Sequence, residues 1–69
     1  MFYYIQDPAT GEFWDSKKKE WGKDGFPYSY AKFAARTIKR HNFSAIVVEE
    51  VNNYATGKVE YREVKDDIR

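Results

Sequence analysis

The amino-acid sequence predicts a small α+β domain of ββαββ order, in which one helix packs on one face of a four-stranded antiparallel sheet. Three observations lead to this prediction. A turn signal joins two aromatic-rich segments, a central segment repeats its alanines with a helical period, and two segments near the end of the sequence are joined by a second turn. The 69 residues allow one domain. We expect it to span residues 1–64, with residues 65–69 as a frayed tail.

The first hairpin is predicted from residues 2–15. Residues 2–6 are aromatic or β-branched apart from a glutamine, which favours a strand. Residues 7–11 carry turn chemistry, because Pro8 fixes φ and Gly11 accepts a positive φ. Residues 12–15 then form the returning strand. The polar residues 16–20, Trp21 and the glycine-containing residues 22–27 are expected to be a loop.

The helix is predicted over residues 30–41. Ser29 is a suitable N-cap and Asn42 a suitable C-cap. At about 100° per residue the small and apolar side chains fall on one face and the cations on the other. The apolar face consists of Ala31, Ala34, Ala35 and Ile38, and the basic face of Lys32, Arg36, Lys39 and Arg40.

The second hairpin is predicted from residues 45–51 and 58–64. The second of these segments alternates as a half-buried strand does, which turns Val59 and Tyr61 toward the core. The tripeptide Ala-Thr-Gly occurs at 9–11 and again at 55–57. Two turns that need the same chemistry explain this repeat more simply than an internal duplication does.

The composition indicates a globular, non-membrane protein. The formal net charge is +1, but residues 16–43 carry eight cations and two acids, whereas residues 44–69 carry four cations and six acids. Aromatic residues make up 19% of the chain, which supplies apolar area to a small core. The chain has no cysteine and no apolar run of membrane-spanning length, so we expect a cytoplasmic location and no membrane partner.

Catalysis is not expected. His41 is the single histidine, and it has no cysteine partner and no second histidine at metal-ligand spacing. Glu49 and Glu50 are adjacent on a predicted strand and therefore point to opposite faces. The sequence thus predicts a non-enzymatic protein without a metal or cofactor.

Two kinds of binding site remain open. Cations interleaved with rings favour a nucleotide or a single-stranded nucleic acid, and the candidates are Trp21, Phe33, Arg36, Lys39 and Arg40. Rings on an uncovered sheet face favour a protein partner or a homodimer, and there the candidates are Trp14 and Tyr4. The competing interpretation is a solvated basic face with the rings buried in the core.

Several features occur together in residues 2–51. They are an aromatic first strand, Thr10-Gly11 followed by Phe13-Trp14, the loop residue Trp21, the spaced helix alanines and the segment Val48-Glu49-Glu50-Val51. In this pattern the chain resembles small accessory proteins encoded by phages and prophages. The resemblance implies a protein that inhibits or sequesters a host component, such as a defence protein or a nucleotide signal. Direct nucleic-acid binding and a structural role in phage morphogenesis are the alternatives.

Overall fold

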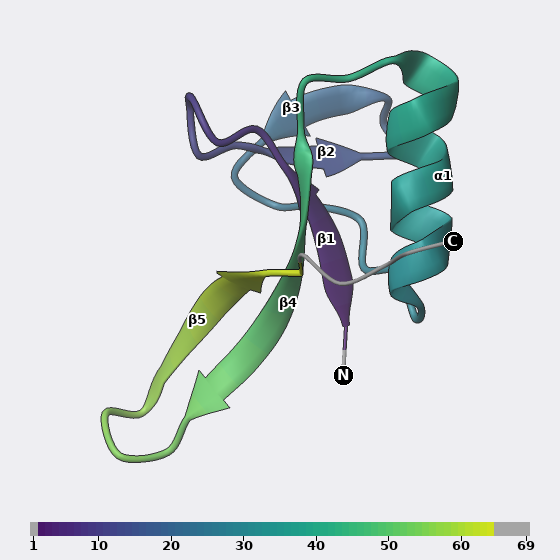
Figure 1. Cartoon of the computed structure of the whole chain (residues 1–69). Coiled ribbons are helices and arrows are strands. Elements are labelled where there is room, and N and C mark those ends of the chain that lie inside the picture. The colour runs from purple at the N-terminus through teal and green to yellow at the C-terminus, as the bar shows by residue number, and fades with distance from the viewer. Residues whose placement is uncertain (1, 65–69) are drawn as a thin grey trace.

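The computed structural model describes residues 2–64, which form one antiparallel sheet and one helix (Figure 1). The strands are β1 (Tyr3–Gln6), β2 (Phe13–Asp15), β3 (Glu20–Gly22), β4 (Ile46–Asn53) and β5 (Lys58–Glu63), and the helix is α1 (Ala31–His41). The spatial order of the strands is β3-β2-β1-β4-β5. The predicted α+β class is confirmed, but the sheet has five strands rather than four. The predicted tail at 65–69 lies outside the described residues.

The additional strand is β3, which the sequence placed in a loop. It pairs with β2 through Phe13 and Gly22, Trp14 and Trp21, and Asp15 and Glu20. The strand is only three residues long and follows three lysines, so its composition carries no strand pattern. Its place is set by the pairing of Trp14 with Trp21, whose ring centroids are 5.4 Å apart.

Three hairpin turns share one geometry. Each begins at an Asp or Asn whose side chain accepts a backbone N–H two residues on and whose carbonyl accepts the N–H four residues on; these residues are Asp7, Asp15 and Asn53. Each ends in the left-handed region, at Gly11 (φ 80°), Lys19 (φ 57°) and Gly57 (φ 72°). The predicted positive φ of Gly11 is confirmed. Because the turn at 15–19 lacks Ala-Thr-Gly, shared turn chemistry accounts for the repeat.

The helix begins one residue later than predicted. Tyr30, not Ser29, is the N-cap, and its side chain makes no capping hydrogen bond. The predicted C-cap is confirmed, because Asn42 is left-handed (φ 59°) and its N–H lies against the carbonyls of Ile38 and Lys39. The predicted apolar face packs against the core, with Ala34 fully buried.

The main core lies between α1 and the sheet. Ile5, Trp14, Ala34 and Val47 are its buried residues. Trp14 lies at one end of this core. The ring centroids of Trp14 and Phe43 are 4.8 Å apart, and Trp21 pairs with Trp14 from the neighbouring strand β3. Both tryptophans therefore face the helix, where they contribute apolar burial.

A second apolar cluster lies on the sheet face away from the helix. Tyr4, Phe13 and Tyr61 form it, with centroid separations of 4.9–5.8 Å. Val48, which pairs with Tyr4, belongs to this face by its alternation with Val47 and is only 2% exposed. The loop after β3 also reaches this cluster, because a Cβ on Gly25 would stand 2.7 Å from the Cβ of Phe13.

Val59 and Tyr61 do not face the main core, contrary to the prediction. Tyr61 pairs with Glu50, and both point away from the helix, as does Val59 by alternation. They are 49% (Val59) and 44% (Tyr61) exposed. Residues 58–63 form a strand as predicted, but the register of β5 on β4 turns Val59 and Tyr61 to the face opposite the helix. Figure 1 shows that this hairpin projects beyond the helix, which leaves its outer half uncovered.

Residues 26–28 fill a gap between β1 and β2. These two strands pair only at Gln6 and Phe13, after which they separate. Tyr28 then takes the vacant side of β1, since Tyr3 and Tyr28 exchange two backbone hydrogen bonds of 2.8 Å. The N–H of Phe26 donates to the carbonyl of Trp14 at 3.1 Å. This segment leads the chain directly into α1.

Candidate binding surface

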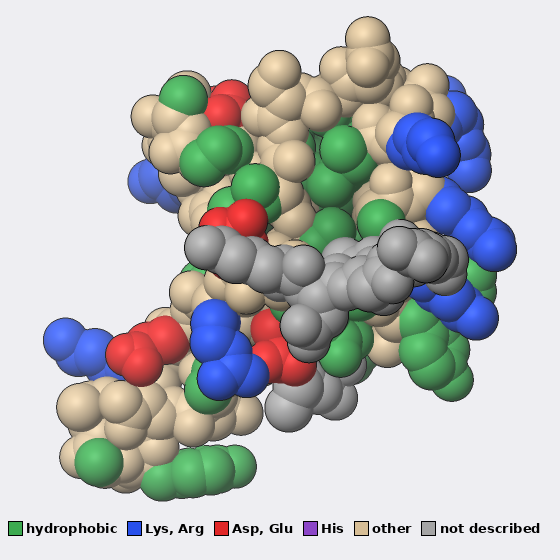
Figure 2. Space-filling view, in the orientation of Figure 1, with side chains coloured by type: hydrophobic (Ala, Val, Ile, Leu, Met, Phe, Trp, Pro, Cys, Tyr) green, Lys and Arg blue, Asp and Glu red, His purple; other side chains and the backbone are tan. Residues whose placement is uncertain are grey.

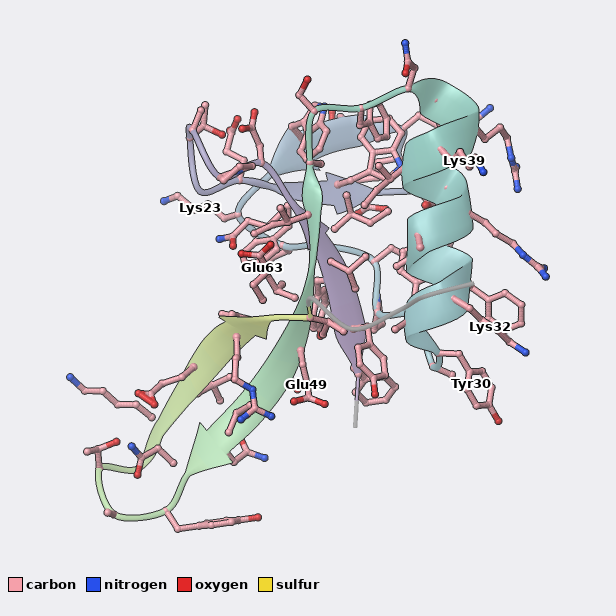
Figure 3. All side chains as sticks on the ribbon, in the orientation of Figure 1. Lys23, Tyr30, Lys32, Lys39, Glu49 and Glu63 are labelled. Atoms are coloured by element: carbon pink, nitrogen blue, oxygen red, sulfur yellow. The ribbon has the colours of Figure 1, made fainter. Side chains whose placement is uncertain are left out.

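The outer side of α1 carries a continuous row of cations and rings, which we call the helix ridge. Its members are Tyr30, Lys32, Phe33, Arg36, Lys39 and Arg40, all exposed. They face solvent because the alanine-rich side of the same helix is buried. Figure 2 shows Lys and Arg side chains gathered along the helix, and Figure 3 shows Tyr30, Lys32 and Lys39 pointing away from the sheet.

Near the start of α1, the rings and cations of the helix ridge contact one another. Tyr30 and Phe33 meet edge to face with centroids 5.6 Å apart, although they are 59% and 41% exposed. The ammonium of Lys32 lies 5.4 Å from the Phe33 centroid, and the guanidinium of Arg36 lies 5.6 Å from it. Each such exposed cation–π contact contributes about 0.5–1 kcal/mol, so the rings and cations are oriented together.

The predicted nucleotide candidates are only partly brought together. Phe33, Arg36, Lys39 and Arg40 share the helix ridge, as the helical spacing implied. Trp21 does not join them, because it packs into the core against Trp14 and Phe43. Tyr30 and Lys32 complete the ridge and were not singled out as site residues. Their signal was available, since Tyr30 lies three residues before Phe33 and Lys32 four residues before Arg36.

The two candidates for the open sheet face also separate. Trp14 is 8% exposed on the helix side. Tyr4 lies on the other face, in the cluster with Phe13 and Tyr61. Partial burial and the nearby charge of Glu50 raise the pKa of both Tyr4 and Tyr61 above the ordinary value of 10.0.

A hollow of about 410 Å³ lies where the β4–β5 hairpin leaves the domain. Its lining residues are Phe2, Glu50, Val51, Asn52 and Tyr54, none of which belongs to the helix ridge. Beside it, Arg62 forms an ion pair with Glu49 across the two strands. The hairpin is therefore a mixed-charge region with acids in excess, at the opposite side of the molecule from the ridge (Figures 1 and 2).

Residues 2–64 contain no group of three or more His, Cys, Asp or Glu placed to hold a metal ion. Within the same range, α1 is too short and too polar to cross a membrane. Searches with the chain against protein-family models, curated proteins and solved structures found no match.

Proposed function

We propose that the protein is a non-enzymatic binding protein that uses the helix ridge to dock on an acidic surface of a partner protein. The observation that carries this proposal is the exposed Tyr30–Phe33 pair held between Lys32 and Arg36. Transfer of the exposed apolar surface of these two rings from water into an interface is favourable, so contact with a partner would stabilise a complex.

The composition of the ridge favours a protein partner. Tyr and Arg are enriched at the energetic centres of protein interfaces. The four ridge cations supply long-range attraction to an acidic partner and accelerate its association. The acidic hairpin on the other side of the molecule is unfavourable for a long polyanion that wraps the domain, but it does not obstruct a partner confined to the helix.

The biological role that we propose follows the resemblance to phage and prophage accessory proteins. Docking of the ridge would inhibit or sequester a host component in the cytoplasm. A nucleotide signal held jointly by Trp21, Phe33 and Arg36 draws less support, because Trp21 packs into the core. A structural role in morphogenesis and a homodimer through the open sheet face remain predictions.

Single-stranded nucleic acid is the second candidate, and one observation favours it. Phe33 and Tyr30 are exposed rings among cations, and such rings stack on bases while the cations contact phosphates. The two candidates differ in salt dependence. Each phosphate that a cation neutralises releases counterions, so nucleic-acid affinity falls steeply with salt concentration.

The test compares matched variants in quantitative affinity capture from a bacterial lysate, with native mass spectrometry of the captured complex. Phe33→Ala with Arg36→Ala removes the centre of the ridge. Tyr54→Ala with Lys58→Ala removes one exposed ring and one cation from the hairpin and serves as the control. We expect the Phe33→Ala, Arg36→Ala double variant to capture at least tenfold less partner. The hairpin double variant should capture the same amount as the unmodified protein.

Equal retention by both variants would reject the ridge as the docking surface. A labelled oligothymidine measured by fluorescence anisotropy tests the second candidate. Affinity for it that falls at least tenfold between low and moderate salt, and that Phe33→Ala reduces, would favour nucleic acid over protein.

A further inference from the structure

A recess of about 240 Å³ lies where the turn at 15–19 meets the end of α1. Its lining residues are Trp14, Ser16, Lys19, Thr37, Arg40 and His41. Only Arg40 also belongs to the helix ridge. The lining offers an ammonium, a guanidinium and an imidazole, and it includes no Asp or Glu. By contrast, the hollows beside the hairpin and beside β3 both have acids in their walls.

Trp14, one of the residues that line the recess, carries an unsatisfied donor. Trp14 is 8% exposed, and its indole Nε1–H is buried without a hydrogen-bond partner within residues 2–64. Such a group is unusual, since burial removes its hydrogen bond to water and nothing replaces it. The ring stays there because Trp21 and Phe43 pack against it. An acceptor bound in the recess would supply the missing partner.

The hydroxyl groups of the wall are already committed to one another. Thr37 Oγ1 donates to the carbonyl of Phe33 at 3.1 Å, and the Tyr28 hydroxyl donates to Thr37 Oγ1 at 3.4 Å. The Ser16 and Tyr28 hydroxyl groups are hydrogen-bonded to each other, and either oxygen can be the donor. This chain of hydroxyls ties the turn to the helix. The donors left for a ligand are the Trp14 indole, Lys19, Arg40 and His41.

From this geometry we infer that the recess binds a small oxyanion of the phosphate class, either inorganic phosphate or a small phosphomonoester. Its volume lies below the roughly 300–1,000 Å³ typical of sites for drug-sized ligands, so the fit is to one phosphate group rather than to a whole nucleotide. Arg40 and Lys19 supply charge-assisted hydrogen bonds, and the Trp14 N–H supplies a directed one.

The recess lies at the end of α1 where helix carbonyls are partly negative. That opposing charge is reduced because two of the free carbonyls are capped. Phe43 donates to the carbonyl of Ile38 at 3.1 Å, and Asn42 donates to that of Lys39 at 3.3 Å. The ring of His41 stacks on Phe43 with an interplanar angle of 9°, which keeps it at the rim.

The experiment is a titration with sodium phosphate at constant ionic strength, followed through the indole N–H signals in nitrogen-15 NMR spectra. We expect the Trp14 indole signal to shift and saturate, and phosphoserine as a small phosphomonoester to produce the same response. The Trp21 indole, which does not line the recess, serves as the internal reference. Sodium chloride alone is expected to leave the Trp14 signal in place.

Matched variants distinguish specific phosphate binding in the recess from nonspecific attraction to positive charge. Lys19→Gly removes the ammonium and keeps a residue suited to φ 57°, so the fold survives. We expect it to weaken phosphate binding roughly tenfold, whereas Lys17→Gly, in the same turn but outside the recess, leaves binding unchanged. Phe33→Ala tests independence from the ridge and should also leave phosphate binding unchanged.

The inference is overturned if the Trp14 signal does not saturate with phosphate, or if Lys17→Gly and Lys19→Gly weaken binding equally. Trp14→Phe keeps the ring and deletes the donor. Unchanged phosphate affinity in this variant, measured by the backbone N–H of Ser16, would also overturn it. Because Phe33→Ala targets the helix ridge alone, failure of the recess and failure of the proposed docking surface give different patterns of loss.

Discussion

Lys19 has a side chain that is poorly suited to its left-handed backbone conformation. It occupies the left-handed end of a turn whose two counterparts are Gly11 and Gly57. A side chain in that region costs about 1 kcal/mol relative to glycine. We predict that Lys19→Gly raises the free energy of unfolding by about 1 kcal/mol in chemical denaturation. Lys18→Gly, at a position without positive φ, should bring no gain, and equal effects of the two would argue against the shared turn.

Gly25 is required for a different reason, which is the close approach of its loop to the open sheet face. A Cβ there would stand 2.7 Å from the Cβ of Phe13 and 3.0 Å from a ring carbon of Tyr4. Gly25→Ala is therefore expected to lower the free energy of unfolding by about 1–3 kcal/mol. Gly22 has open space around it, so Gly22→Ala is the control. A comparable loss in both variants would mean that the loop does not lie on Phe13.

At the scale of elements, the helix depends on how its inner face packs. Ile38 is partly buried against the main core, one turn from the fully buried Ala34. Ile38→Ala should lower the free energy of unfolding by about 2 kcal/mol, while Lys39→Ala on the outer side should change it by less than about 0.5 kcal/mol. Thermal unfolding followed by circular dichroism measures both. Similar melting temperatures for the two variants would contradict the orientation of α1.

The predicted elements differ in how much of their structure is local. The C-cap at Asn42, the apolar face of α1 and the turn at Gly11 follow from residues within a few positions, and all three were predictable. The N-cap is Tyr30 rather than Ser29, and no capping side chain marks the position at which the helix begins. Strand β3 and the face of Tyr61 depend on pairing with residues distant in sequence, such as Trp14 and Glu50, and no local pattern contains that information.

The candidate site shows the same division. The helical period brought Phe33, Arg36, Lys39 and Arg40 together correctly. It could not place Trp21 or Trp14, because a tryptophan suits a core and an interface equally well. The recess beside Trp14 was also beyond the sequence, since its walls come from a turn and a helix end more than fifteen positions apart.

At the scale of the whole molecule, the sheet face away from the helix makes stability sensitive to alkali. Burial and the charge of Glu50 raise the pKa of Tyr4 and Tyr61, so the folded state holds these protons more tightly than the unfolded state does. Stability from this cluster is complete below pH 10 and is lost as the pH rises through the folded pKa values. Glu50→Gln should lower both pKa values in an ultraviolet titration of phenolate and reduce that loss.

An unchanged phenolate titration in Glu50→Gln would show that the carboxylate does not act on these two phenols. Asp24 gives a comparison, since it contributes to the raised pKa of Tyr61 but is not a cause for Tyr4. Asp24→Asn is therefore expected to move only one of the two titrations.

The central position of β1 has a consequence for the rate of folding. β1 is joined along most of its length to β4, which follows it only after two further strands and the helix. Pairing of Ile5 with Val47 therefore closes a long loop, and contacts of such sequence separation slow folding. Until β4 docks, β1 lacks its main partner strand, so the native topology is set by a non-local contact.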